Sequence, residues 1–149
     1  MIIRAAIRSD LGAILRLLRD VGAGPHARPS TVRMSSAAVR AWTRIETDPD
    51  RTVLVAERRG QIIGTLDLIV IANLTHDAQS WAVVGNIVVD AACRLQGVGR
   101  ALLEDAVDRA TRAGCYKIQL MPQEDSVDTR GFYHALGFAG ATSGFCRYL

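Results

Sequence analysis

Two glycines in one short loop form the segment of this sequence best suited to chemistry. The segment Arg94-Leu95-Gln96-Gly97-Val98-Gly99 follows an apolar run and precedes a helical pattern. The first turn of a helix leaves several backbone N–H groups without partners, and its dipole adds partial positive charge. Glycine has no Cβ, so a phosphate can approach this backbone closely. The loop is therefore a candidate anion site, although such a loop is often only a turn.

Two nucleotide-binding motifs are excluded for this loop. No Gly-Lys-Ser/Thr follows it, so it is not a Walker loop. Leu102 stands where the third glycine of the dinucleotide fingerprint would fall. A second signal lies downstream, at Gly131-Phe132-Tyr133-His134-Ala135-Leu136-Gly137-Phe138. Taken alone, this octapeptide is equally well interpreted as a short aromatic core helix with a glycine stop.

The two signals together resemble a known family. Arg-x-x-Gly-x-Gly opening a helix, then a strand, then Phe-Tyr-x-x-x-Gly-Phe, is similar to the GNAT superfamily of acetyl-CoA-dependent N-acetyltransferases. The resemblance covers residues 83–138 strongly and the rest in element order. Less specific similarities link residues 114–118 to glucosamine-phosphate acetyltransferases and residues 67–89 to aminoalkylphosphonate acetyltransferases.

The resemblance implies a fold and a cofactor site. It predicts one α/β (α+β) domain over residues 1–149, with a mixed, mostly antiparallel sheet, a splayed strand pair and helices on both faces. The pyrophosphate of acetyl-CoA is expected on the backbone of the glycine loop, formed by Arg94, Leu95, Gln96, Gly97, Val98, Gly99 and Arg100. The pantetheine arm is expected along the splayed strand edge, at Ile87, Val88 and Val89. Tyr133 is expected to face the thioester sulfur.

The implied reaction is direct attack of an amine on the thioester. A backbone N–H near Val88 would stabilise the oxyanion, and Tyr133 would protonate the departing thiolate. A phenol of pKa about 10 and a thiol of pKa about 8.5 are matched closely enough for this transfer.

One position departs from the family pattern. Many relatives carry a glutamate that acts as a base through water, and the matching residue here is Gly85. His76 is the substitute that we name as a catalytic residue, since its pKa lies near neutral. Asp77, His134 and a water relay without a dedicated base stay open as alternatives.

The elements that must position these residues follow from hydrophobic periodicity and turn signals. We expect strands over residues 2–6, 52–56, 62–71, 81–89, 116–121 and 143–149. We expect helices over residues 36–46, 97–113 and 130–136, and a first helix with Leu11, Ile14, Leu15 and Leu18 on its buried face. Ser9 or Asp10 is a candidate cap for that first helix.

Composition sets limits on partners. The chain has 149 residues, 22% of them charged, and a formal net charge of +3. Its arginines are spread along the chain, so nucleic acid is not expected, whereas a phosphate-bearing cofactor is. Three widely spaced cysteines, Cys93, Cys115 and Cys146, predict reduced thiols and no metal site. The N-terminus lacks an apolar signal segment, so we expect a cytoplasmic protein without membrane association.

Two other functions stay open. The chain is either a small-molecule acetyltransferase, a non-catalytic acyl-CoA-binding module, or a transferase acting on protein N-termini or lysines. The amine acceptor is expected between residues 21–35 and 72–80, where Arg28, Arg33 and Arg40 are candidate ligands for a phosphate or carboxylate. A homodimer is also possible.

Overall fold

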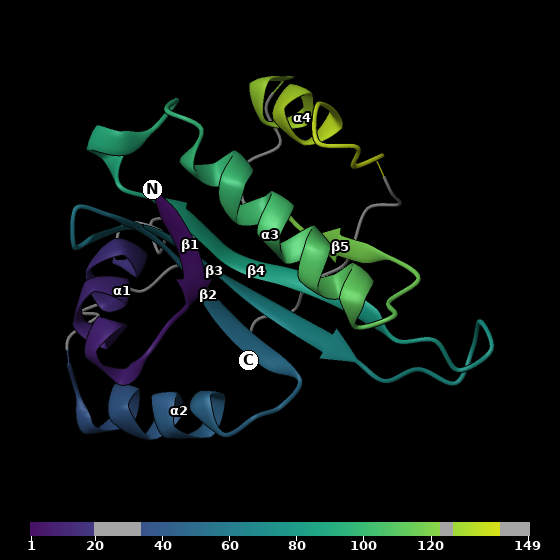
Figure 1. Cartoon of the computed structure of the whole chain (residues 1–149), viewed down its shortest axis with the longest axis horizontal. Coiled ribbons are helices and arrows are strands. Elements are labelled where there is room, and N and C mark those ends of the chain that lie inside the picture. Colours follow the sequence, from purple (N-terminus) through teal and green to yellow (C-terminus); the bar gives the residue numbers. More distant parts are fainter. Residues whose placement is uncertain (20–33, 123–126, 141–149) are drawn as a thin grey trace.

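Five strands form one sheet in the computed structural model, which describes residues 1–19, 34–122 and 127–140. The strands are β1 (Ile2–Ala5), β2 (Arg51–Arg58), β3 (Gln61–Ile71), β4 (Trp81–Val89) and β5 (Ile118–Leu120), in that spatial order. β1 to β4 pair antiparallel, and β5 joins β4 in parallel (Figure 1). The expected mixed, mostly antiparallel sheet is therefore confirmed.

Several strand bounds differ from expectation by one or two residues. β2 extends to both sides of the predicted 52–56, and the tight β2–β3 turn accounts for the extension at its C-terminal end. Arg59 and Gly60 both have positive φ, of 52° and 76°, which suits a two-residue hairpin whose twist matches its strands. β5 is shorter than the predicted 116–121, and the predicted strand 143–149 lies outside the described residues.

Helices cover both faces of the sheet, as expected. α1 (Leu11–Leu18) and α2 (Ser36–Glu46) lie on one face, and α3 (Val98–Arg112) and α4 (Val127–His134) on the other (Figure 1). Two short 3-10 turns, η1 (Arg8–Asp10) and η2 (Ala91–Cys93), precede α1 and α3. α4 begins three residues before the predicted 130–136. Among the described residues, every helix is too short or too polar to cross a membrane.

The prediction that a side chain caps the first helix is wrong for Asp10. Asp10 stands at the N-terminal boundary of α1, but its side chain caps no helical N–H. Its carboxylate instead accepts from the backbone N–H of Ile7 and from Arg4 of β1. Arg4 and the Ile7 amide together engage both carboxylate oxygens, and Arg4 does so through charge-assisted bonds.

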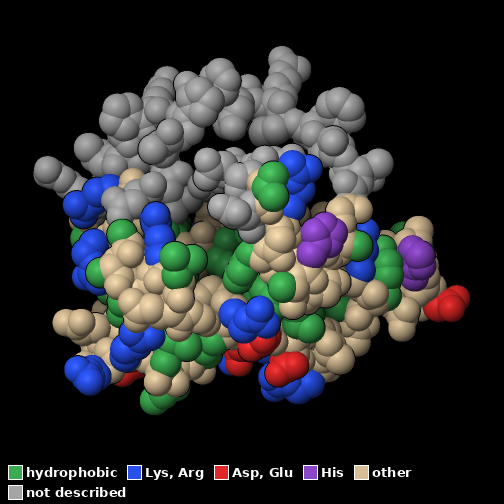
Figure 2. All heavy atoms as spheres, turned by 90° about the horizontal axis from the view of Figure 1, so that it is seen from above, with side chains coloured by type: hydrophobic (Ala, Val, Ile, Leu, Met, Phe, Trp, Pro, Cys, Tyr) green, Lys and Arg blue, Asp and Glu red, His purple; other side chains and the backbone are tan. Residues whose placement is uncertain are grey.

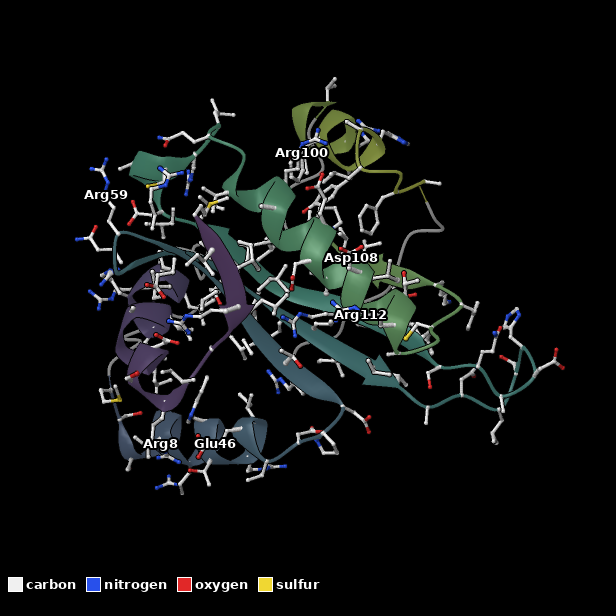
Figure 3. All side chains as sticks on the ribbon, in the orientation of Figure 1. Arg8, Glu46, Arg59, Arg100, Asp108 and Arg112 are labelled. Atoms are coloured by element: carbon white, nitrogen blue, oxygen red, sulfur yellow. The ribbon has the colours of Figure 1, made fainter. Side chains whose placement is uncertain are left out.

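Alternation along the strands separates two hydrophobic clusters. Leu54 packs with Leu66 and Leu102 against α3, whereas its neighbour Val55 packs with Trp42 against α1 and α2. Arg8, just before α1, forms an ion pair with Glu46 at the end of α2, on the same face of the sheet as the second cluster (Figure 3).

The start of α3 lies close against β3 at Gly64. A Cβ at Gly64 would stand 3.0 Å from Val98 Cγ1 and 3.1 Å from Leu102 Cδ1, closer than packed atoms normally come. The absence of a side chain therefore fixes where α3 begins on the sheet, and with it the loop before α3. On the face shown in Figure 2, the Lys and Arg side chains of the described residues are scattered rather than gathered into one patch.

Candidate active site

β4 and β5 separate halfway along β4. β5 pairs with Ala82, Val83 and Val84, and within the described residues no strand pairs with the rest of β4 on that side. A bulge bends β4 there, because Thr65 faces Val88 while Asp67 faces Gly85. One residue of β3 thus opposes two of β4, and Asn86 takes a φ of +51°. Bulges sharpen strand bend and twist, which accounts for the splayed pair.

A cavity opens at this splay. Its walls come from β4, from the end of β5 and from α4, through Val84, Gly85, Asn86, Ile87, Leu120, Met121, Pro122, Thr129 and Tyr133. The cavity therefore joins the two segments that the sequence singled out separately, the strand before the glycine loop and the Phe-Tyr helix.

Tyr133 contributes the phenol in the cavity wall. Its ring packs edge-on against Phe132 and Phe138, with centroid distances of 5.2 and 6.0 Å. Burial raises the pKa of Tyr133 above its ordinary value, because the phenolate would lose hydration. The hydroxyl consequently stays protonated at neutral pH and is able to donate a proton.

The glycine loop has the backbone of an anion site. Gly97 stands at the N-cap of α3 with a φ of +80°, and no side chain caps the helix there. By contrast, Ser35 caps α2 through a 3.1 Å bond from the N–H of Ala38. The first N–H groups of a 15-residue helix therefore point outward at the loop without a side-chain acceptor.

Side chains of the loop brace its shape. Gln96 Nε2 donates to the carbonyl of Ala92 at 2.9 Å, and Gln96 Oε1 accepts from Arg58 Nη1 at 2.8 Å. Arg94 Nε donates to the carbonyl of Val89 at 3.4 Å. These bonds leave the backbone, rather than the Gln96 amide, as the surface for a ligand.

The other predicted cofactor residues differ in whether their side chains are exposed or buried. Leu95 is fully exposed, with a φ of +59°, whereas the Val98 side chain is buried in the core. Arg100 is exposed near α4 and lies 3.6 Å from Glu104 (Figure 3). An ideal Cβ at Gly99 would lie 3.6 Å from Phe132 Cζ, so the start of α3 adjoins α4.

Along β4, Ile87 lines the cavity. The side chains of Ile87 and Val89 both pack on the hydrophobic cluster under α3. Val88 turns its side chain to the opposite cluster, against α1 and α2. Only its backbone is available to the splay.

Comparison with known proteins decides the family. The model of the acetyltransferase (GNAT) family matches residues 18–138. The chain belongs to the GNAT family of acetyltransferases. Enzymes of this family use acetyl-CoA as co-substrate.

Individual relatives agree with this assignment. A glucosamine 6-phosphate N-acetyltransferase of Trypanosoma brucei brucei is 30% identical over 137 residues, 91% of this chain and 87% of that protein. A crystal structure described as a transcriptional regulator from Bacillus halodurans C-125 is 29% identical, with a TM-score of 0.89 and 99% of both chains covered. Glucosamine-6-phosphate N-acetyltransferase of Arabidopsis thaliana shares the fold at 21% identity, with a TM-score of 0.82 over 99% of this chain and 97% of that one.

None of the named base candidates of this GNAT protein lines the cavity in the described part of the chain. His76, in the β3–β4 connection, stacks on Tyr116 with a centroid distance of 4.1 Å. Neither His76, Asp77 nor His134 is among the described residues that line the cavity with Tyr133. Within those residues, no three His, Cys, Asp or Glu side chains are grouped closely enough to hold a metal ion.

A polar cluster beside Gly85 is the feature that sequence reasoning missed. Asp67 is buried in β3, where its Oδ2 accepts from Arg51 Nη2 at 2.6 Å and from Asn86 Nδ2 at 2.9 Å. The available signal was one carboxylate within the apolar run 62–72. Of the predicted acceptor region, residues 21–33 lie outside the described residues, with Arg28 and Arg33 among them, and Arg40 is exposed on α2.

Proposed function

We propose that this chain transfers the acetyl group of acetyl-CoA to a primary amine of a small molecule, such as an amino sugar phosphate or an aminophosphonate. The observation that carries the proposal is the cavity in which Tyr133 meets the unpaired stretch of β4. An uncapped helix start, suited to a pyrophosphate, follows that strand at Gly97.

In this proposal the cofactor lies along the splay. Backbone amides from Arg94 to Arg100 hold the pyrophosphate, and the edge at Ile87, Val88 and Val89 pairs with the pantetheine arm. A backbone N–H near Val88 stabilises the oxyanion that forms when the amine attacks the thioester carbonyl. Acetyl-CoA then supplies both the acyl group and the leaving thiol.

Tyr133 is the proposed general acid. Its raised pKa keeps the proton in place until the C–S bond breaks, when the thiolate can take it. The phenol ring is held between Phe132 and Phe138, which limits its movement. Such positioning of a donor contributes alongside proton transfer itself.

The acceptor is proposed from chemistry and from one relative's name. A protein 30% identical to this chain is described as a glucosamine 6-phosphate N-acetyltransferase, which supports an amine on a phosphorylated sugar. The mild net charge of +3 suits an anionic substrate and cofactor.

A thiol-release assay tests the proposal. Acetyl-CoA is mixed with the protein and with glucosamine 6-phosphate, aminomethylphosphonate, spermidine or single amino acids, and free CoA and acetylated product are measured. We expect product with at least one small amine. Binding of acetyl-CoA by calorimetry without product from any amine would favour the non-catalytic binding module. Product only from peptide N-termini or lysines would favour a protein acetyltransferase.

A cytoplasmic location is part of the proposal. Cys93 and Cys115 are free in the described part of the chain, which suits a reducing compartment. A homodimer and the single-domain division over residues 1–149 stay predictions.

A further inference from the structure

We propose that Asp67 holds the attacking amine, in place of the carboxylate that is absent at Gly85. This inference rests on the proposed function, since it assigns a residue to the amine of that reaction. The ligand class is a protonated primary amine, which an unpaired carboxylate oxygen recognises through a charge-assisted hydrogen bond.

The cross-strand register places Asp67 next to the position of the missing glutamate. Asp67 of β3 pairs with Gly85 of β4. Side chains of directly paired residues stand on the same face, with Cβ atoms about 4.5–5.5 Å apart. Leu66 and Val84, one step along each strand, both pack in the cluster under α3, so Asp67 and Gly85 face the opposite side. A carboxylate therefore reaches the face on which a glutamate at position 85 would lie.

Space for a ligand exists at Gly85. No atom of the described residues lies within 4 Å of an ideal Cβ at this position. Gly85 and Asn86 also line the cavity that contains Tyr133. Asn86 in turn bonds to Asp67, so one residue joins the carboxylate to the cavity wall.

The bonding of Asp67 differs from that of a structural carboxylate in the same chain. Asp10 is equally buried and arginine-paired, but both of its oxygens accept, Oδ1 from Arg4 and Oδ2 from Arg4 and Ile7. At Asp67 both hydrogen bonds go to Oδ2, and Oδ1 accepts none from the described residues. The Asp67 side chain also keeps 10% of its surface exposed.

The cost of the cluster also favours a functional role. A buried N–H without a partner costs about 1–3 kcal/mol, and Arg51 Nε is such a group while its Nη2 orients Asp67. At Asp10, by contrast, the arginine is satisfied throughout, because Arg4 Nη1 and Nη2 bond to Asp10 and Arg4 Nε bonds to Glu57.

The proton balance of the reaction is complete with these two residues. The ammonium gives one proton to Asp67, and the freed lone pair forms the C–N bond to the thioester carbonyl carbon. The C–S bond breaks with its electron pair on sulfur, which takes the Tyr133 proton. The second proton lost by nitrogen returns through water to Tyr133, and the proton on Asp67 leaves to solvent. Acid and base thus act from opposite faces of β4.

The test compares Asp67→Asn with Asp10→Asn. The amide keeps the size of Asp67 and an oxygen for Arg51 and Asn86, but it removes the charge. With the best amine among glucosamine 6-phosphate, aminomethylphosphonate and spermidine, we expect kcat/KM of Asp67→Asn to fall by roughly 10²–10³-fold. Acetyl-CoA affinity should stay within about twofold of wild type, because the cofactor lies at the other face. Asp10→Asn should lower the melting temperature and leave kcat/KM of the folded enzyme near wild type.

A rescue variant separates a catalytic role from a structural one. Asp67→Asn combined with Gly85→Glu returns a carboxylate to the same gap, and we expect at least about tenfold recovery of kcat/KM. Near-wild-type kcat/KM in Asp67→Asn would overturn the inference while the proposed function stands. So would parallel loss of acetyl-CoA affinity and melting temperature that the added Gly85→Glu substitution does not rescue. If wild type acetylates none of the small amines of the panel, single amino acids included, the proposed function fails and the inference fails with it.

Discussion

Arg58 Nη1 lies 2.8 Å from Gln96 Oε1, so the end of β2 braces the loop that precedes α3. The same Gln96 amide donates to the carbonyl of Ala92, which ties the loop to η2. The loop geometry therefore depends on a residue 38 positions away in the chain.

Arg58→Ala should weaken acetyl-CoA binding without unfolding the protein. A single exposed hydrogen bond contributes about 0.5–1.5 kcal/mol, so we expect the Kd to rise roughly 2–10-fold. Calorimetry measures the Kd. Arg59→Ala is the matched control, since it removes the charge of the next residue in the chain (Figure 3), whereas the bond to the Gln96 amide comes from Arg58. Equal losses in both variants would assign the effect to charge rather than to the brace.

Gly99→Ala should separate cofactor binding from stability. An alanine Cβ there would meet Phe132 and Val89 at ordinary contact distances of 3.6 and 3.7 Å, and alanine favours helix by up to about 1 kcal/mol. The melting temperature should hold or rise, while the Cβ stands at the backbone proposed for the pyrophosphate. We expect at least about tenfold weaker acetyl-CoA binding, equivalent to roughly 1.4 kcal/mol. Unchanged affinity in the folded variant would refute the assignment of the loop.

Gly97→Ala should instead lower both the melting temperature and the affinity for acetyl-CoA. The φ of Gly97 is +80°, a conformation that costs an L-residue about 1–2 kcal/mol, even though its Cβ would meet no described atom within 4 Å. Gly97→Val carries the same backbone strain, so it separates cofactor binding from stability less well than Gly99→Ala does. Thermal melting and calorimetry on Gly97→Ala check this, with Gly99→Ala as comparison; a stable Gly97→Ala variant would contradict the strain argument.

Tyr133→Phe should slow the chemical step by roughly two to four powers of ten, or less where water substitutes. The ring packing against Phe132 and Phe138 is retained, so acetyl-CoA affinity should change little. Single-turnover kinetics measures the step. Because burial raises the pKa of Tyr133, wild-type stability should also fall above pH ~10, where only the unfolded chain has lost the proton, and the variant should lack this part of the loss. Wild-type turnover in the variant would remove Tyr133 from the mechanism.

Asp10→Asn should destabilise the protein in a pH-dependent manner. Hydrogen bonds from Arg4 hold the pKa of Asp10 below its ordinary value, against the opposing effect of burial. A carboxylate with a lowered pKa stabilises the fold above its unfolded pKa of about 4, and this stability is lost as pH falls through the folded pKa. Denaturant melts should show a loss of about 1–3 kcal/mol at pH 7 that shrinks below pH ~4. A loss independent of pH would assign the effect to packing.

His76→Ala distinguishes the two base assignments. If Asp67 holds the amine, we expect kcat of His76→Ala within about twofold of wild type, since His76 stacks on Tyr116 outside the cavity wall. A marked drop at neutral pH, together with a flattened acidic limb of the rate profile, would assign the base to His76 because histidine accepts a proton only when neutral. Tyr116→Phe keeps the stacked ring and serves as the control.

The sequence alone determined the features that depend on neighbouring residues. Glycines at 97 and 99 before an amphipathic pattern specify a loop and a helix start, because φ preferences and helical periodicity act within a few residues. The β2–β3 hairpin and the Phe-Tyr helix were predicted for the same reason, with errors of a few residues at their ends.

The tertiary structure decided what lies across the sheet. Nothing local relates Asp67 to Gly85 or Arg51 to Asp67; the register of β3 with β4 brings the first pair together, and the register of β2 with β3 the second. Asp10 likewise has the residue type and position of a helix cap, but its carboxylate bonds to Arg4, which also reaches across to Glu57 of β2. A hydrogen bond or charge contact forms with whichever partner packing places nearby, so long-range pairs follow from the assembled sheet and not from spacing along the chain.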